Sequence, residues 1–414
     1  MPPLGLRGRK HPDLTRRELV MSEPLRVILT CNYSPWSRYS GGGQRSTHAL
    51  GTALVSLGHD VTVIFTKVPG ERLGVPDRLP YRLRWSALAG LRSDGKNPLR
   101  FLNMLPMARS VAQELNRPSV GRASIVNAQG EESAWFAQSL RARRPSGVRF
   151  VQTPRYPRFP DPLRGALGGR IWLRPKFATL GYALRRACRV CPTSTPTADA
   201  LARLFGVPRS RLEVIPNGLD EGFLTAKRAP TAATGPLVFF GRLSKSKGIV
   251  DLIDAWLDLD ERIPLVIGGT GPERPVLEAR IAERGRRSDV QWLGWCDAAT
   301  MAETLAGARA AVLPSHEESF GNTMVEAMAA GTPLITTDAG SIPEVTGGER
   351  HVTLVPAENA SKLREAMGRD LARPEELEAR AAIARDFARA QYSWVKTARR
   401  YEDVYHHCLA EPPR

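Results

Sequence analysis

The sequence has few cysteines and no long apolar run, and these shortages exclude several classes of protein. Its five cysteines are scattered over 414 residues, which is typical of a protein from a reducing cytoplasm, the location that we expect. No stretch approaches the roughly 18 apolar residues that a membrane-spanning helix needs. Residues 1–22 are basic but lack the apolar segment of a signal peptide, so we predict a disordered arm or an extension upstream of a true start at Met21.

Metal ligands are scarce as well. Cys188 and Cys191 form a single Cys-x-x-Cys pair, with no second pair and no nearby histidine. Two buried thiols are therefore favoured over a zinc or redox site. No cluster of metal ligands stands out elsewhere, so we expect neither a metal nor a cofactor.

Length and charge bound the remaining classes. A chain of 414 residues is too long for one ordinary core and predicts two domains. Apolar residues make up 42%, which is typical of a soluble globular protein. The formal charge of +17 suits nucleic acid, an anionic membrane surface or negatively charged substrates, although arginine-rich composition alone also explains part of it.

Short apolar strands alternate with helical segments in both halves of the chain. Residues 25–33 and 61–65 are predicted as strands that flank a helix ending at Gly58. Further strands are predicted at residues 124–129, 148–153, 188–193, 236–243, 264–271, 290–295, 310–315 and 333–338, and a strand with a turn at residues 212–220. The alternation predicts an α/β protein with two Rossmann-like domains that face one another across a cleft. Ligands of such sheets bind beyond the carboxyl ends of the strands, so the loops there are the candidate sites.

Two cations follow the first strand of the second half. Arg242 comes just after this strand and Lys247 lies five residues later, before a helix. Cations beside a helix N-terminus can bind a phosphate or diphosphate. Taken alone, the pair is also explained by a solvated basic loop.

Glycines and a tryptophan follow the next two strands. Gly269 and Gly271 let backbone approach a flat ligand such as a nucleobase, although such turns are common. Trp295 is placed to line the same pocket, with packing in the core as the alternative.

Two glutamates flank a helix start in the segment ESFGNTMVE. Glu318 is predicted in the loop and Glu326 inside the helix, with Gly321 at the helix start. A carboxylate accepts two hydrogen bonds in a fork and so suits sugar hydroxyls. The apolar neighbours of Glu326 indicate burial, and a buried carboxylate needs a partner. We therefore predict that the two glutamates bind opposite ends of one extended ligand, near free backbone N–H groups of Phe320, Gly321 and Asn322.

This segment resembles the Glu-x7-Glu signature of retaining glycosyltransferases of family 4, which have the two-domain GT-B fold. The resemblance extends from about residue 25 to residue 405, because further motifs follow in the family's order. They are the GGG loop at 41–43, Ser194, IPNGLD at 215–220, GRLSKSKG at 241–248, GGTGP at 268–272, WLGW at 292–295, YSW at 392–394 and Tyr405.

The resemblance implies domain boundaries. An acceptor-binding domain is expected over residues 23–216 and a nucleotide-sugar-binding domain over residues 217–394. A C-terminal helix, residues 395–414, is expected to pack back on the first domain.

The resemblance also implies roles for single residues. Glu318, Arg242 and Lys247 would be catalytic, the two cations neutralising the diphosphate leaving group in place of a metal. Glu326 would bind the ribose. The remaining donor-binding residues would be Gly42, Gly43, Gly269, Gly271, Trp295, Ser319, Phe320, Gly321 and Asn322.

One position departs from the family. Many members carry a histidine at the end of strand 124–129, where this chain has Asn127 and Gln129. Glutamine can donate and accept hydrogen bonds but cannot shuttle a proton. His48 and His316 are alternative imidazoles for the cleft.

Acceptor binding is predicted from the first domain, at Gln129, Arg155 and Tyr156. Residues 155–189 and 78–109 are basic and carry aromatic side chains, which suits an anionic membrane surface, an acidic glycan or, less well, single-stranded nucleic acid. Solvated arginines explain the same pattern.

We expect a retaining, metal-independent transfer from a nucleotide sugar, UDP-linked, to a glycan, lipid-linked saccharide or small metabolite in polysaccharide or glycoconjugate biosynthesis. A membrane-peripheral location and the absence of a nucleic-acid partner are part of this expectation. The alternatives are an epimerase or disaccharide phosphorylase on the same fold, and a non-catalytic basic membrane-binding protein.

Overall fold

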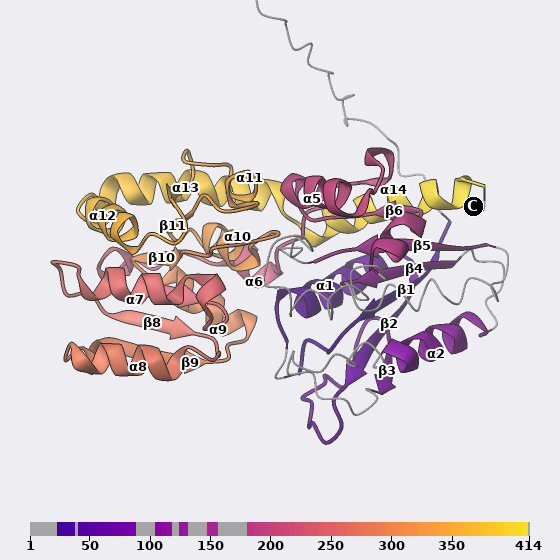
Figure 1. Cartoon of the computed structure of the whole chain (residues 1–414), viewed down its shortest axis with the longest axis horizontal. Coiled ribbons are helices and arrows are strands. Elements are labelled where there is room, and N and C mark those ends of the chain that lie inside the picture. Colours follow the sequence, from indigo (N-terminus) through magenta and orange to yellow (C-terminus); the bar gives the residue numbers. More distant parts are fainter. Residues whose placement is uncertain are drawn as a thin grey trace, which may run out of the picture.

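The computed structural model describes residues 23–37, 40–87, 104–117, 124–130, 147–155 and 180–412. These residues form two α/β domains that lie side by side (Figure 1). Each domain contains a six-stranded sheet in which all pairings are parallel. The predicted fold class is confirmed.

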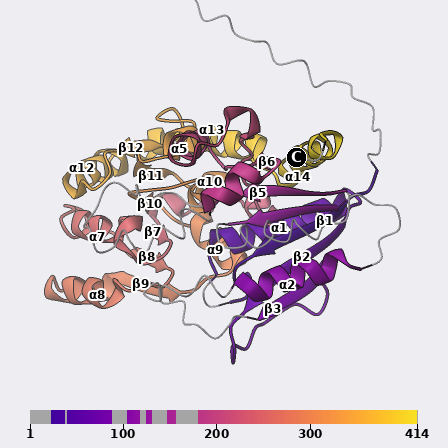
Figure 2. The same ribbon diagram turned by 45° about the vertical axis from the view of Figure 1, so that its right-hand side comes forward.

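The first sheet has the strand order β3-β2-β1-β4-β5-β6. Its strands are β1 (Arg26–Cys31), β2 (Asp60–Lys67), β3 (Arg82–Ala87), β4 (Ser124–Gln129), β5 (Val148–Thr153) and β6 (Arg189–Val190). Every residue of β1 and β4 is buried, as expected of strands that helices cover on both faces. The helices are α1 (Gly42–Ser56), α2 (Met104–Leu115) and α5 (Thr195–Phe205). Figure 2 shows α2 alongside β2 and β3.

The second sheet has the strand order β12-β11-β10-β7-β8-β9. Its strands are β7 (Leu237–Phe240), β8 (Leu265–Gly268), β9 (Val290–Gly294), β10 (Ala310–Leu313), β11 (Leu334–Thr337) and β12 (Thr353–Val355). The helices are α6 (Glu221–Thr225), α7 (Ile249–Leu257), α8 (Arg274–Glu283), α9 (Ala298–Ala306), α10 (Asn322–Ala329), α11 (Ile342–Thr346), α12 (Ala360–Leu371) and α13 (Pro374–Gln391).

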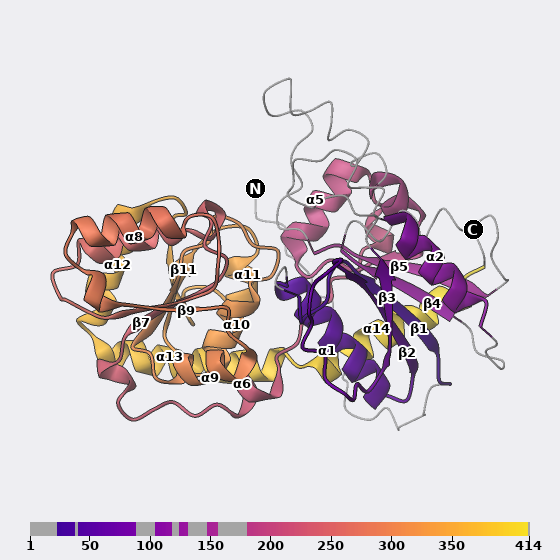
Figure 3. The same ribbon diagram turned by 90° about the horizontal axis from the view of Figure 1, so that it is seen from below.

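The last helix, α14 (Trp394–Ala410), lies on the first domain. Figures 1 and 3 show α13 beside the second domain and α14, also in yellow, continuing beside the first. Tyr401 and Tyr405 of α14 are buried in the core of the first domain, where they join residues of β1, α1 and β2. Arg149 of β5 donates hydrogen bonds to the carbonyl oxygens of Cys408 and Glu411. The C-terminal helix is therefore an integral part of the first domain.

Strand order places the candidate loops. In the first sheet the direction of winding reverses between β1 and β4, and in the second between β7 and β10. Crevices form at such switch points because the loops after the two central strands diverge to opposite faces. The glycine loop follows β1, Gln129 ends β4, the Lys247 loop follows β7, and Glu318 follows β10.

Three sequence-based expectations were wrong or incomplete. Residues 212–220 form no strand: only Leu212 bridges to Val190, and the segment then continues as a loop through Pro216 and Gly218. Strand β3 was not predicted, because its arginine-rich sequence lacks the apolar pattern of a buried strand. Strand β12 was missed because it has only three residues.

Candidate functional site between the two domains

The loop after β7 places Lys247 beside Glu318. Lys247 ends a single 3₁₀ turn, Lys245–Lys247, and Gly248 then adopts φ +66°, where a side chain would collide with the carbonyl oxygen of Pro314. This close approach brings the two loops of the switch point together. Lys247 Nζ lies 2.5 Å from Glu318 Oε1. Ser315 Oγ donates to the same carboxylate oxygen at 3.1 Å.

Arg242 lies in the same loop, with its side chain exposed. Within the described part of the chain it forms no ion pair, so its guanidinium is available to a ligand. Lys247 and Arg242 thus differ: the first already carries a carboxylate partner, and the second does not.

The two glutamates lie where the sequence predicted them. Gly321, at φ +81°, caps α10, so Glu318 belongs to the loop and Glu326 to the helix. Glu326 is only 5% exposed. Phe320 is buried too, and its ring meets the ring of Tyr392 edge-on with centroids 5.4 Å apart. Only the backbone of Phe320 is therefore available to a ligand.

Glu326 is paired with a cation from the opposite domain. Arg45 Nη2, on α1, lies 2.6 Å from Glu326 Oε1 and 3.6 Å from Asp220 Oδ2. Burial raises the pKa of Glu326, and the charge of Arg45 lowers it in part. Glu326 Oε2 is buried and has no hydrogen-bond partner among the described residues. A buried acceptor without a donor is costly, and a ligand hydroxyl at this position would satisfy it.

Arg45 was not among the predicted site residues. The segment GGGQR was interpreted for its glycines, and nothing in it indicates that the arginine contacts the second domain. The contact depends on the packing of α1 against α10, which only the fold reveals.

The glycine loop packs directly against the start of α10. Asn322 Nδ2 lies 3.4 Å from the carbonyl oxygen of Gly42 and 3.2 Å from Ser46 Oγ. A side chain at Gly42 would collide with the Asn322 amide, and one at Gly43 would press on Arg155. The contact therefore leaves little room for a side chain at either position. In a second contact between the domains, Thr193 Oγ1 donates to the carbonyl oxygen of Ser319 at 3.0 Å.

Arg155, at the end of β5, connects the predicted acceptor side to this contact. Its Nε lies 3.0 Å from Gln129 Oε1, and its Nη1 lies 2.7 Å from Asn217 Oδ1. Asn217 in turn donates to Asn322 Oδ1 at 2.8 Å. The structure thus brings Gln129 and Arg155 together. Tyr156 lies outside the described residues.

The other candidate polar groups have partners within the domains. Asn127 donates to the hydroxyl oxygen of Tyr405 at 2.8 Å, which ties β4 to α14. His48 Nδ1 lies 2.6 Å from the Tyr81 hydroxyl, and burial lowers the pKa of this histidine. His316 Nε2 lies 2.7 Å from Asp251 Oδ2 on α7.

Gly269 and Gly271 are required by a neighbouring loop. Side chains at these positions would collide with the carbonyl oxygens of Gly241 and Leu243, so the loop after β8 can pack on the Arg242 loop only with glycine there. This packing by itself requires glycine at both positions. Their role in donor binding stays a prediction.

Trp295 is 59% exposed, which excludes the core-packing alternative for this residue. It lines a cavity of about 630 Å³ between the domains. The lining residues are Trp36, Ser37, Pro69, Gly70, Glu71, Arg72, Thr270 and Trp295. An exposed indole at the carboxyl edge of the second sheet is suited to stack on a flat ligand.

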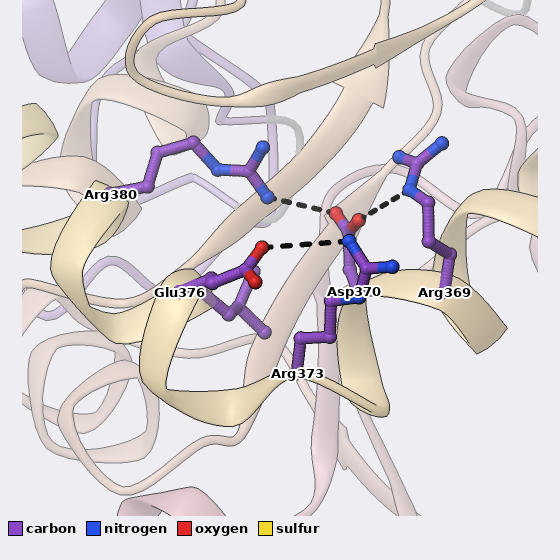
Figure 4. A pocket seen from close by; sticks show the side chains of 6 residues that line it. Arg369, Asp370, Arg373, Glu376 and Arg380 are labelled. Carbon is purple, nitrogen blue, oxygen red and sulfur yellow. Dashed lines mark hydrogen bonds and ion pairs between the residues drawn. The ribbon is translucent and has the colours of Figure 1, made fainter.

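A second cavity, of about 320 Å³, lies between α12 and α13 (Figure 4). Its arginines face carboxylates: Arg369 and Arg380 each lie 3.0 Å from Asp370, which also accepts a hydrogen bond from Thr353. Because the charges are paired, we interpret this cluster as a structural link between the two helices.

Asp370→Asn should therefore lower stability without changing ligand affinity. We expect a loss of about 1–3 kcal/mol in the free energy of unfolding, discounted because both arginines are partly exposed. Urea denaturation measures this loss. Glu376→Gln, which removes only an exposed pair with Arg373 at 3.7 Å, serves as the control and should cost at most about 0.5 kcal/mol. A parallel loss of nucleotide affinity in Asp370→Asn would contradict the structural interpretation.

Two arginines of the basic stretch 78–109 are paired with a carboxylate inside the first domain, so they are less available to a ligand than the sequence indicated. Arg82 and Arg84 lie on β3, where their guanidinium groups lie 3.3 and 2.7 Å from the buried carboxylate of Glu114. Most of the other basic and aromatic residues of 78–109 and 155–189 lie outside the described residues. None of the helices described is long and apolar enough to span a membrane.

Comparisons with known proteins agree with this architecture. Residues 40–223 match the family model described as "Glycosyltransferase Family 4", and residues 230–387 match "Glycosyl transferases group 1". The chain is 27% identical over 387 residues to glycogen synthase of Mycobacterium tuberculosis, which covers 88% of this chain and 91% of that protein. It is 30% identical over 227 residues to D-inositol 3-phosphate glycosyltransferase of Xylanimonas cellulosilytica, and the match covers 50% of this chain and 54% of that protein.

Solved structures share the fold at lower sequence identity. Sucrose-phosphate synthase from Thermosynechococcus elongatus superposes with a TM-score of 0.78 at 21% identity, covering 93% of this chain and 99% of that chain. HepE of Anabaena, in complex with UDP and glucose, superposes with a TM-score of 0.72 at 17% identity, covering 92% and 100%.

Proposed function

We propose that this chain, a GT-B glycosyltransferase with a family 4 domain followed by a group 1 domain, transfers a sugar from a UDP-linked donor with retention of configuration. The observation that carries the proposal is the pair of carboxylates at the second switch point. Glu318 lies beside Lys247, and the buried Glu326 has one oxygen that no described residue bonds. Between them α10 begins, with backbone N–H groups free for a ligand.

In this proposal the donor extends along the carboxyl edge of the second sheet. The ribose would donate a hydroxyl to Glu326 Oε2, and the base would lie near Trp295. The diphosphate would lie between the glycine loop and the cations Arg242 and Lys247. Glu318, whose carboxylate Lys247 and Ser315 hold in place, would accept hydrogen bonds from the transferred sugar. The solved complex of HepE with UDP and glucose supports a donor of this class.

The proposed reaction is a front-face substitution. The bond between the anomeric carbon and the phosphate oxygen breaks while the acceptor oxygen bonds to that carbon from the same face. The acceptor proton passes to the departing phosphate oxygen, and the products are the glycoside and the nucleoside diphosphate. Negative charge develops on the leaving group, so positive charge that is already in place there lowers the barrier. The cations of the chain supply this charge in our proposal, which requires no metal.

The acceptor is proposed as a glycan, a lipid-linked saccharide or a small metabolite. The relatives are named for glycogen, inositol phosphate and sucrose phosphate, so their names span polymers and small hydroxyl compounds. A contact with anionic membrane stays a prediction, which flotation with anionic liposomes would test.

The first experiment is a binding screen with nucleoside diphosphates and their sugars. UDP should stabilise the folded protein by about 2.7 kcal/mol at one hundred times its dissociation constant, seen as a rise in melting temperature. Uridine, which lacks the diphosphate, is the matched control and should stabilise much less. If no nucleoside diphosphate or nucleotide sugar raises the melting temperature or is hydrolysed, the proposed function is wrong.

A further inference from the structure

Arg155 is a cation whose hydrogen-bond acceptors are all neutral. Its Nε and Nη2 groups donate to Gln129 Oε1, and its Nη1 group donates to Asn217 Oδ1. Within the described part of the chain no carboxylate lies within ion-pair distance of it. The titratable groups that face it among the described residues are the Tyr401 hydroxyl and the Cys31 thiol, and neither is a carboxylate.

The environment of this guanidinium is costly for a charge. Burial lowers the pKa of Arg155, yet arginine stays protonated in proteins. A partly buried cation without a counter-ion carries a desolvation penalty that amide oxygens offset only in part. Partly buried arginines elsewhere in the described chain either face carboxylates, as Arg45 and Arg84 do, or donate to backbone carbonyl oxygens, as Arg389 does. Arg155 is the one at the interdomain contact that faces none among the described residues.

The position of Arg155 indicates which kind of molecule would supply its anionic partner. A side chain at Gly43 of the glycine loop would touch its Cδ. Asn217 links Arg155 to Asn322, because it accepts a hydrogen bond from Arg155 and donates one to Asn322. Asn322 is the first residue of α10 and donates to the carbonyl oxygen of Gly42. Arg155 therefore lies where both switch points meet, next to the proposed diphosphate position. Its side chain is not fully buried, so a ligand can reach it.

Gln129 acquires a different role in this arrangement. It occupies the position where relatives of this type were expected to carry a histidine, and its amide oxygen accepts from two nitrogens of Arg155. The glutamine thus orients a permanent cation where a titratable imidazole was expected. An arginine cannot accept a proton from a substrate hydroxyl, but it binds two oxygens of a phosphate in a fork.

We propose that Arg155 is a substrate-binding residue that pairs with a phosphate group in the closed site. The phosphate is either the donor's diphosphate or one carried by the acceptor. This inference rests on the proposed function and adds a third cation, from the first domain, to the two of the second domain.

The test compares wild type with Arg155→Met and Arg155→Lys by isothermal titration calorimetry. If the partner is the donor's diphosphate, Arg155→Met should bind UDP about 10- to 100-fold more weakly and uridine equally well. If the partner is an acceptor phosphate, UDP affinity should stay within twofold. Glucose 6-phosphate, fructose 6-phosphate or inositol phosphate should then bind wild type with UDP present, and Arg155→Met should lose that binding. Arg155→Lys should retain part of the affinity in either case.

Arg186→Met is the matched control, because Arg186 is exposed and stacks on Tyr182 away from the contact between the domains. It removes the same charge and should change neither affinity. The proposal is overturned if Arg155→Met leaves UDP affinity within twofold of wild type and no sugar phosphate distinguishes the two proteins. If wild type binds no nucleoside diphosphate, the proposed function fails. Binding of inorganic pyrophosphate to wild type but not to Arg155→Met would then still support Arg155 as a phosphate ligand.

Discussion

Lys247→Met is expected to lower kcat for sugar transfer by about 100- to 1,000-fold, the range typical of removing one preorganised group that stabilises developing charge. The ammonium lies 2.5 Å from Glu318 and on the loop that also carries Arg242. In our proposal it faces the leaving diphosphate, whose negative charge grows as the glycosidic bond breaks. Steady-state kinetics with a UDP-sugar, followed by UDP release, measures the effect. The donor KM should rise less than kcat falls, because the charge is largest in the transition state.

Two further variants separate catalysis from the ion pair itself. Lys245→Met removes an exposed lysine two residues away in the same turn and should leave kcat within twofold. Lys247→Met combined with Glu318→Gln removes both charges of the pair. If Lys247 acted only by neutralising Glu318, the double variant would recover activity; we expect it to stay as low as the single variant or lower.

The fold could be predicted from sequence because the buried parallel strands repeat one recognisable pattern. Strands such as β1 and β10 are short apolar segments, and each ends at a loop with its own glycines or charges. The failures have local physical reasons. Strand β3 is an edge strand in which arginines paired with Glu114 alternate with Leu83 and Trp85, so its sequence lacks the continuous apolar run of the central strands. Residues 212–220 contain apolar residues like a strand, but Pro216 removes a backbone donor.

The candidate site could be predicted on one side only. Lys247 and Glu318 lie in the loops after two neighbouring strands of one sheet, and Glu326 lies in the helix that follows Glu318, so their proximity follows from the strand-loop-helix pattern. Arg45 and Asn217 take part through packing between the domains, and no spacing along the chain encodes that packing. The resemblance implied that Gly42 and Gly43 close over the donor diphosphate, which stays a prediction; in the structure this loop meets the start of α10.

Glu326→Gln is expected to weaken UDP binding about 10- to 100-fold, the range for losing a hydrogen bond to a charged group. The amide keeps the shape of the side chain but accepts more weakly, and it no longer attracts Arg45. The folded protein should not be destabilised. Burial raises the pKa of Glu326, so the folded state penalises the charge of this group, and relief of that penalty offsets the loss of the ion pair with Arg45. Calorimetric titration of UDP measures the first effect and the melting temperature without ligand the second. Glu303→Gln, an exposed glutamate on α9, is the control for both.

The same glutamate predicts a pH dependence of donor binding. Its raised pKa means that protonation, and with it the loss of UDP affinity, begins at a higher pH than for an ordinary glutamate. Arg45 opposes this rise, while Asp220 adds to it. Arg45→Ala should therefore raise the pKa further, so that UDP affinity falls at higher pH than in wild type, whereas Arg45→Lys should restore part of the difference. Glu326→Gln should abolish this acid limb. If UDP affinity in Arg45→Ala showed the wild-type pH profile, the ion pair across the domains would not control the charge of Glu326. If Glu326→Gln kept the acid limb, Glu326 would not be the group whose protonation weakens UDP binding.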